Sequence, residues 1–226
     1  MLEGTGVHRM SQQRADTVRA IEACGVVAII RMREAEKLRA VVDALGEGGV
    51  RALEVTMTVP GAIDLIGKLA PALPAGFVLG AGTILDAETA RLAILAGAQF
   101  VVGPVFRPEV IAMCHRYDIA AMPGCFTPTE ILSAWEAGAD VVKVFPATAL
   151  GPGFVKDVRG PLPQVKLMPT GGVSLDNAGD WIAAGAVAVG VGTALLDAAA
   201  IAAGNYAVIA ANAKRIVASV AAARAK

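Results

Sequence analysis

Short apolar runs alternate with longer amphipathic stretches along most of the chain. Eight such runs begin 19 to 26 residues apart, a spacing that accommodates one strand, one helix and two short loops. The runs are almost continuously apolar, as expected for parallel strands that are covered on both faces. They occupy residues 26–31, 52–57, 78–83, 100–104, 119–124, 141–146, 166–172 and 188–192.

The joints between these segments repeat as well. An Ala-Gly-Ala triplet centred on Gly97, Gly138 or Gly185 ends a helical pattern just before a strand, and glycine supplies the left-handed conformation that closes a helix. Residues 127–130 and 174–176 combine a capping hydroxyl with an acid in the first turn. Both segments are therefore predicted to begin helices.

Eight strand–helix units with buried strands predict an α/β protein that folds as a single (β/α)8 TIM barrel. We expect one domain over residues 1–226, in which 25–200 form the barrel core. Residues 1–24 are predicted to form an N-terminal segment and helix that caps the bottom of the barrel, and 206–226 a long C-terminal helix. The alternative is a doubly wound open sheet, although such sheets commonly have five or six strands and no edge strand is evident.

Composition and charge exclude several classes of protein. Apolar residues make up 55% of the 226 residues, which excludes a disordered chain. Lys plus Arg and Asp plus Glu both number 20, so electrostatic binding of nucleic acid or an anionic membrane is not expected. The three cysteines form no CxxC pair, as is typical of a reduced cytoplasm. The first 19 residues lack the apolar core of a secretory signal, and the membrane-like stretch 181–204 is interrupted by Thr193 and Asp197, so we expect a cytoplasmic protein without a membrane span.

Two ionisable residues occupy strand positions that an ordinary barrel core would reject. If Val142 and Val144 pack outward against helices, Lys143 points into the barrel. Burial lowers the pKa of an amine, and a neutral amine is what imine formation with a ketone requires. Glu54 lies on the inward face of the second strand and is a candidate general base or acid. The alternatives are a lysine held by a salt bridge and a purely structural Glu54–Lys143 ion pair.

Two glycine-rich strand ends suggest an anion site. Residues 169–173 (PTGGV) follow the seventh strand and residues 190–193 (GVGT) follow the eighth, where many such barrels bind phosphate through backbone N–H groups. Arg31, at the end of the first strand, offers a cation for a carboxylate or phosphate, or is a surface arginine. Thr83 is placed either to bind a carboxylate oxygen or to cap the next helix.

Searches for other chemistry find little. The two histidines have no carboxylate spacing typical of zinc, and no GxSxG motif is present. Cys125 is interpreted as a small apolar filler. We expect neither a metal ion nor an organic cofactor.

Taken together, five motifs give the chain a resemblance to the 2-keto-3-deoxy-6-phosphogluconate aldolases with 4-hydroxy-2-oxoglutarate aldolase activity. The similarity runs from about Gly25 to about Leu196. By this resemblance Lys143 would be the Schiff-base lysine, Glu54 the proton-transfer residue and Thr83 a contact to the pyruvate carboxylate. The motifs are LEVT at 53–56, GAGT at 80–83, PG at 123–124 with TPTE at 127–130, KVFP at 143–146, and PTGGV at 169–173.

The resemblance also implies the remaining parts of the site. Pro104 and Phe145 would line the pocket, and the family forms trimers. The substrate phosphate would be held by Thr170, Gly171, Gly172, Gly192 and Thr193. One departure concerns Thr58, which stands where many members have an arginine. Another branch of the family has Thr-Val-Pro there and an arginine at the end of the first strand, so we hypothesise that Arg31 supplies the missing cation.

The implied reaction is a class I aldol cleavage of a 2-keto-3-deoxy-6-phosphosugar acid to pyruvate and glyceraldehyde 3-phosphate, or of 4-hydroxy-2-oxoglutarate to pyruvate and glyoxylate. The sequence does not distinguish the gluconate from the galactonate derivative. Two other classes stay open: a phosphate-binding barrel isomerase or synthase without a Schiff base, and a non-catalytic sugar-acid sensor. The expected partners are therefore a small 2-keto acid and further copies of the chain.

Overall fold

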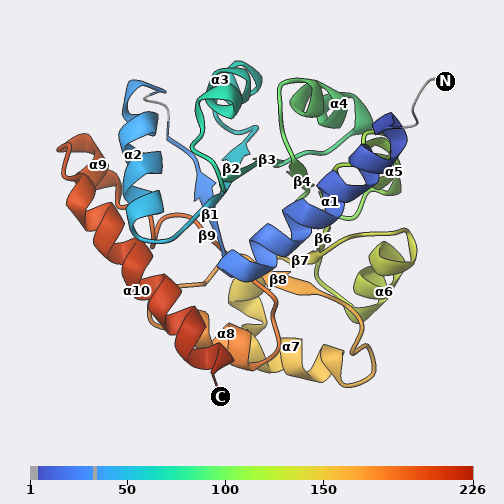
Figure 1. The fold of residues 1–226 in the computed structure, drawn as a ribbon. Coiled ribbons are helices and arrows are strands. Elements are labelled where there is room, and N and C mark those ends of the chain that lie inside the picture. The colour runs from blue at the N-terminus through green and yellow to red at the C-terminus, as the bar shows by residue number, and fades with distance from the viewer. Residues whose placement is uncertain (1–4, 33–34, 226) are drawn as a thin grey trace.

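A computed structural model describes residues 5–32 and 35–225 of the chain (Figure 1). Helices surround a central set of strands, and the first helix crosses the strands on one side. Every strand predicted from an apolar run is present. The elements are α1 (Thr5–Cys24), β1 (Val26–Ile30), α2 (Ala35–Glu47), β2 (Ala52–Thr56), α3 (Ala62–Leu69), η1 (Ala70–Ala72), β3 (Val78–Gly82), α4 (Ala87–Leu95), β4 (Phe100–Val102), α5 (Pro108–Arg116), β5 (Ala120–Met122), β6 (Gly124–Cys125), α6 (Pro128–Glu136), β7 (Val142–Val144), η2 (Ala147–Ala149), α7 (Gly151–Arg159), β8 (Leu167–Pro169), α8 (Ala178–Ala183), β9 (Val189–Val191), α9 (Ala198–Ala202) and α10 (Tyr206–Arg224).

The strands form two parallel sheets rather than one continuous ladder. Six strands lie in the order β5-β4-β3-β2-β1-β9, and three lie in the order β6-β7-β8. The fifth predicted strand is divided between the two sheets at Pro123, because proline has no N–H group to donate to a ladder. At the other junction, a single parallel bridge pairs Thr170 with Gly190. The architecture is therefore α/β with parallel strands, as predicted.

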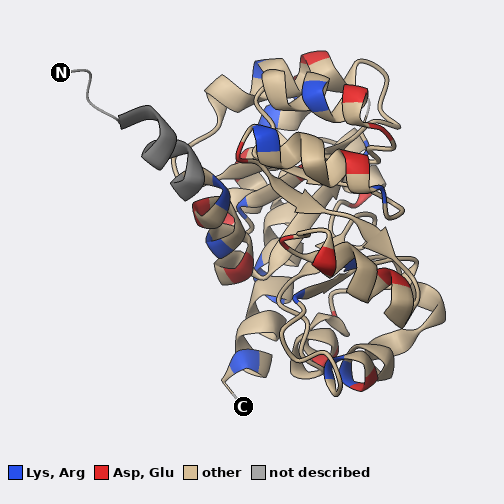
Figure 2. Cartoon of the chain, turned by 90° about the vertical axis from the view of Figure 1, so that its right-hand side faces the viewer, with Lys and Arg blue, Asp and Glu red and all other residues tan. Residues whose placement is uncertain are grey.

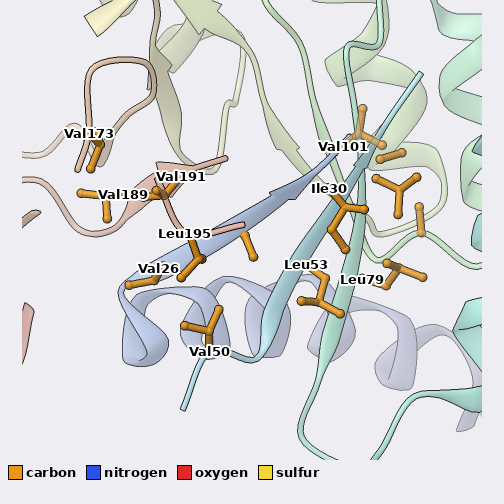
Figure 3. Packing of buried hydrophobic residues seen from close by; sticks show 14 of the residues in the cluster. Val26, Ile30, Val50, Leu53, Leu79, Val101, Val173, Val189, Val191 and Leu195 are labelled. Carbon is orange, nitrogen blue, oxygen red and sulfur yellow. The ribbon is translucent and has the colours of Figure 1, made fainter. Parts of the chain in front are cut away.

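Two groups of buried apolar side chains hold the strands in place. The larger group lies between the strands and the outer helices and includes Leu53 and Leu79, which Figure 3 shows on neighbouring strands. The smaller group lies at the N-terminal ends of the strands, where Val18 and Ile21 of α1 pack against residues such as Val27. The helix α1 thus covers the N-terminal ends of the strands.

The loop chemistry follows the sequence closely, with one exception. Gly97, Gly138 and Gly185 all have positive φ angles, between 95° and 111°, as expected for glycines that end helices. Thr127 forms a capping box with Glu130 at the start of α6. The helix predicted from residue 174 begins only at Ala178. The Ser174 hydroxyl accepts bonds from the N–H groups of Asp176 and Asn177, as a capping residue does, but the residues between form a turn.

The C-terminal helix α10 (Tyr206–Arg224) is long and apolar. Within the described ranges, it is the one helix whose length and mean hydropathy of 1.2 would allow it to cross a membrane. Its buried residues recur every three or four positions, at Ile209, Ala213, Ile216 and Val220, and the helix packs against α2 and α8. This spacing is typical of a helix that packs one face against a protein core.

Candidate active site

Lys143 is buried at the centre of the three-stranded sheet. It lies on β7 between Val142 and Val144, which pack into the outer apolar group, and only 5% of its surface is exposed. Its Nζ atom is 4.7 Å from the centroid of the Phe145 ring. Because successive side chains of a strand point to opposite faces, Lys143 and Phe145 share the inner face.

Glu54 is buried on the inner face of β2. The residue is 2% exposed, and in the register of the sheet it lies opposite Gly80 of β3. A Cβ atom on Gly82 would overlap Glu54 Oε1, so the glycine leaves the space that the carboxyl group occupies. Glu54 Oε2 is buried without a hydrogen-bond partner among the described residues. An unpaired buried carboxyl oxygen is costly and is available to a ligand.

The electrostatics of these two groups are opposite. Burial raises the pKa of Glu54 above its ordinary value, and the charges of Lys143 and Arg31 only partly oppose this shift. Burial lowers the pKa of Lys143; Glu54 opposes this shift and Arg31 adds to it. No Lys143–Glu54 ion pair within 4.0 Å is found in the described structure, although the charge of each group acts on the other. Both shifts favour the neutral form, which is the form of an amine that attacks a carbonyl.

Arg31 and Thr58 lie at the open edge of this region. Arg31 follows the last residue of β1 and is exposed, and its charge acts on both buried groups. Thr58 is also exposed, and its Oγ1 lies 2.6 Å from Oγ1 of the buried Thr56. Arg31 therefore contributes charge to the region of Lys143, whereas Thr58 offers only a hydroxyl that is already bonded.

Three further candidates lie along the strand ends. Thr83 follows β3 with a φ of 61°, which is an unfavourable conformation for a β-branched residue and marks local strain. Pro104 follows β4, and its backbone would collide with a Cβ atom on Gly124, the residue that lies opposite Lys143 in the sheet. Phe145 is half-buried beside the lysine.

The loop after β8 presents unused hydrogen-bonding groups. Thr170 is 4% exposed, and its Oγ1 has no hydrogen-bond partner in the described part of the chain. Gly171 and Gly172 have φ angles of 90° and 71°, and neither N–H group finds a backbone acceptor among the described residues. Consecutive N–H groups in such a conformation form a concave site for an anion.

A cavity of about 370 Å³ adjoins the ends of β1 and β9. Its lining includes Arg31, Gly192 and Thr193 together with apolar residues such as Met32 and Leu196. The structure thus places Arg31 together with the two candidates that follow the eighth predicted strand. Thr170 approaches the same strand through its bridge to Gly190.

Sequence reasoning missed two contributors to the site. Gly82 belongs to a motif that was noted, but its contact with Glu54 depends on the pairing of β2 with β3. Thr148 received no role, yet its Oγ1 would lie 3.2 Å and 3.1 Å from Cβ atoms on Gly171 and Gly172. Thr148 precedes Gly171 by 23 residues in the sequence, so only the fold brings these two loops together.

Other reactive groups show no organised site. Within residues 5–32 and 35–225, no cluster of three or more His, Cys, Asp or Glu side chains could hold a metal ion. Burial raises the pKa of the Cys125 thiol to about 12. A thiol with so high a pKa is a poor nucleophile, in agreement with its interpretation as a small apolar side chain.

The fold and the site define a parallel α/β protein in which a buried amine faces a buried carboxyl group near the C-terminal ends of the strands. A model of the family described as "Aldolase: KDPG and KHG aldolase" matches residues 18–212. The chain belongs to this family.

Individual relatives agree with that assignment. The chain is 37% identical over 188 residues to the 2-dehydro-3-deoxy-phosphogluconate aldolase of Treponema pallidum. The aligned region covers 83% of this chain and 89% of the relative. The native KDPGal structure superposes with a TM-score of 0.82 at 30% identity, covering 89% and 96% of the two chains. KDPG aldolase from Legionella pneumophila, with pyruvate captured as a covalent carbinolamine, gives a TM-score of 0.82 at 28% identity and covers 88% and 97%.

Proposed function

We propose that this protein is a class I aldolase that cleaves 2-keto-3-deoxy-6-phosphogluconate to pyruvate and glyceraldehyde 3-phosphate, or 4-hydroxy-2-oxoglutarate to pyruvate and glyoxylate, or both. The observation that carries the proposal is the buried amine of Lys143 facing Glu54. The capture of pyruvate as a carbinolamine in the Legionella pneumophila relative supports the same chemistry, since that adduct precedes an imine.

Lys143 begins the reaction as a nucleophile. Its neutral Nζ attacks the C2 carbonyl carbon, and loss of water from the carbinolamine gives a protonated imine. The low pKa that burial imposes on the amine keeps a larger fraction of it neutral near neutral pH.

Glu54 then moves protons. Its carboxylate accepts the proton of the C4 hydroxyl, the C3–C4 bond breaks, and its electron pair passes into the imine to give an enamine while the aldehyde leaves. The same carboxyl group returns a proton to C3, and water hydrolyses the new imine to release pyruvate and free Lys143. The raised pKa of Glu54 suits a group that must both accept and donate a proton.

The remaining candidates hold the two ends of the substrate. Thr83 binds the carboxylate, and Arg31 supplies a cation for the carboxylate or the phosphate, since it lines the same cavity as Gly192 and Thr193. Pro104 and Phe145 line the pocket around the reacting carbons. The phosphate is bound by the loop groups that lack partners and by the end of the eighth predicted strand, namely Thr170, Gly171, Gly172, Gly192 and Thr193. No cofactor or metal ion takes part in this scheme.

Reductive trapping tests the proposal directly. Borohydride added with pyruvate should attach the reduced three-carbon adduct to Lys143, as peptide mass spectrometry would show. Lys143→Met should abolish both the adduct and the cleavage, whereas Lys156→Met, at an exposed position on α7, should retain both. Cleavage without any adduct would indicate an enzyme that uses Lys143 only as a charge.

A second candidate substrate is the galactonate derivative, which is favoured by the superposition on the KDPGal structure. The two sugar acids differ at one stereocentre. A panel of both phosphorylated acids and their unphosphorylated forms, compared by kcat/KM, decides the preference and shows whether the phosphate is needed.

We also propose that Arg31 replaces the arginine that other members have at the position of Thr58. Arg31→Ala should raise KM much more than Thr58→Ala, because only Arg31 carries a charge toward the buried pair. Equal small effects of the two substitutions would refute this assignment.

The finer architecture and assembly are part of the proposal. We propose that the chain is one domain whose two sheets close into a (β/α)8 barrel through the segment interrupted at Pro123 and the Thr170–Gly190 bridge.

Three free cysteines support a cytoplasmic location. Exposed leucines at 85, 92 and 95, which are 50–60% accessible, support a homo-oligomer, for which we propose a trimer; Leu92→Glu should reduce the mass measured by light scattering.

A further inference from the structure

Asp140 lies at the start of the strand that carries Lys143, near the end of the molecule covered by α1. Its backbone N–H donates to Ala121 O at 3.0 Å, and the Ala121 N–H donates to Asp140 Oδ2 at 2.9 Å. The other carboxylate oxygen, Oδ1, accepts a bond from Arg14 Nε of α1 at 2.9 Å. One side chain therefore links α1, β5 and the approach to β7, and only 11% of it is exposed.

The hydrogen bonds along this edge show that one residue is inserted before β7. In a regular parallel pair, both the donors and the acceptors recur every second residue. Here the acceptors keep that spacing and the donors do not. The bonds run from Asp140 N to Ala121 O, from Lys143 N to Pro123 O and from Phe145 N to Cys125 O.

The opposite edge confirms the insertion. Val142 N donates to Lys166 O, toward β8, whereas a regular strand would direct residues 140 and 142 to the same neighbour. Two residues of this strand thus stand opposite one on its partner, which defines a β-bulge. Consistent with a bulge, two consecutive side chains reach α1: Asp140 bonds Arg14, and Val141 packs in the group that contains Val18.

The bulge determines which way the lysine points. A slip of one residue turns every following side chain to the other face of a strand. After the bulge, Val142 and Val144 pack outward and Lys143 faces Glu54. Without the inserted residue, the same pairing would direct Lys143 outward, beneath the helices.

We propose that Asp140 is a positioning residue for Lys143: its reciprocal pair of bonds with Ala121 fixes the bulge and so keeps the lysine directed into the site. The inference rests on the proposed role of Lys143. The carboxylate accepts the Ala121 N–H at 2.9 Å next to the inserted residue, and the ion pair with Arg14 ties the same point to α1.

Three variants separate the two bonds of the carboxylate. Asp140→Leu has a similar size but no acceptor, Asp140→Asn keeps an acceptor for the Ala121 N–H, and Arg14→Gln removes only the ion pair. The measurements are kcat per trapped active site, the rate of borohydride trapping with pyruvate as a function of pH, and the melting temperature.

We expect Asp140→Leu to lower kcat per site by roughly ten- to a hundredfold, as small displacements of a reacting group do. The pH at which trapping is half-maximal should also rise, because a displaced lysine is better solvated. Asp140→Asn should restore most of the activity, and Arg14→Gln should lower the melting temperature with little change in kcat.

Several outcomes would overturn the inference. An Asp140→Leu enzyme with the kcat and pH profile of the wild type would show that Asp140 contributes only to stability. If Asp140→Leu does not fold, a loss of kcat in Arg14→Gln or Asp140→Asn beyond roughly tenfold would contradict the role of the Ala121 bond. Failure of the wild-type enzyme to trap pyruvate would instead reject the proposed function.

Discussion

The two ends of the strands treat polar groups in opposite ways. At the N-terminal ends, Asp140 is bonded to Arg14 and to the backbone, and Lys166 Nζ lies 2.6 Å from Glu22 Oε1. At the C-terminal ends, Glu54 and Lys143 are buried within reach of each other's charge but form no ion pair among the described residues. Paired groups rigidify a structure, whereas unpaired buried groups cost stability. The polar groups of the first end therefore stabilise the fold, and those of the second end are the ones that we propose act on a ligand.

The C-terminal residues further stabilise the N-terminal ends of the strands, which α1 covers and which form the closed end of the molecule. Arg224 of α10 donates to the carbonyl oxygens of Ala23 and Val187 at 2.9 and 3.0 Å, and so joins the last helix to the segments next to β1 and β9. Gly25 has a φ of 71°, and a Cβ atom there would contact Arg224. Figure 2 shows Lys and Arg interspersed with Asp and Glu on the helices of the side that faces the viewer.

The largest expected effect on kcat comes from removing the carboxylate of Glu54, at the C-terminal ends of the strands. Glu54→Gln should lower kcat by about 10²–10⁴-fold, the usual contribution of a general acid–base group. Trapping of pyruvate on Lys143 should persist, because the amine is intact. Steady-state kinetics and peptide mass spectrometry on the same sample measure the two quantities. Simultaneous loss of the adduct would mean that Glu54 is needed already for imine formation.

A smaller effect is expected when the carboxyl group is displaced rather than removed. The Cβ atom of Gly82→Ala would overlap Glu54 Oε1, so the side chain must move, and kcat should fall by roughly ten- to a hundredfold. Gly67→Ala in α3 is the matched control, since nothing lies within 4 Å of its Cβ position. The control should keep its kcat and gain about 0.5–1 kcal/mol in the free energy of unfolding. A Gly82→Ala enzyme with full activity would show that the carboxyl group need not stay in place.

The sequence predicts most of the strands and helices at both ends of the molecule. Apolar runs locate the strands because both faces of each strand are buried, and the alternation around Lys143 indicates its inward direction. The cap formed by α1 follows from its position before the first strand. What local patterns do not predict are contacts set by strand pairing, such as the one between Gly82 and Glu54.

Two features show why the remaining details depend on the fold. Pro123 interrupts the fifth strand because it has no N–H group to donate to a neighbouring strand, and the effect of this depends on which strand lies beside it. The bulge at Asp140 is visible only from hydrogen bonds to β5 and β8, since Asp140-Val141-Val142 reads as an ordinary strand start.

The smallest effect concerns stability and its dependence on pH. Burial holds the pKa of Glu54 above its ordinary value of 4.5, so above pH 4.5 the unfolded chain loses this proton before the folded chain does. The wild type should therefore lose stability as the pH rises from 4.5 to the raised pKa, by up to about 1.4 kcal/mol per pH unit. Glutamine does not titrate, so the stability of Glu54→Gln relative to the wild type should increase over the same range in urea unfolding experiments.

Asp16→Asn, which breaks the exposed pair with Arg19 at the closed end, should change the free energy of unfolding by less than about 1 kcal/mol. A stability difference between Glu54→Gln and the wild type that does not vary with pH would show that Glu54 is as well solvated as the charges at the closed end, and the contrast between the two ends would fail.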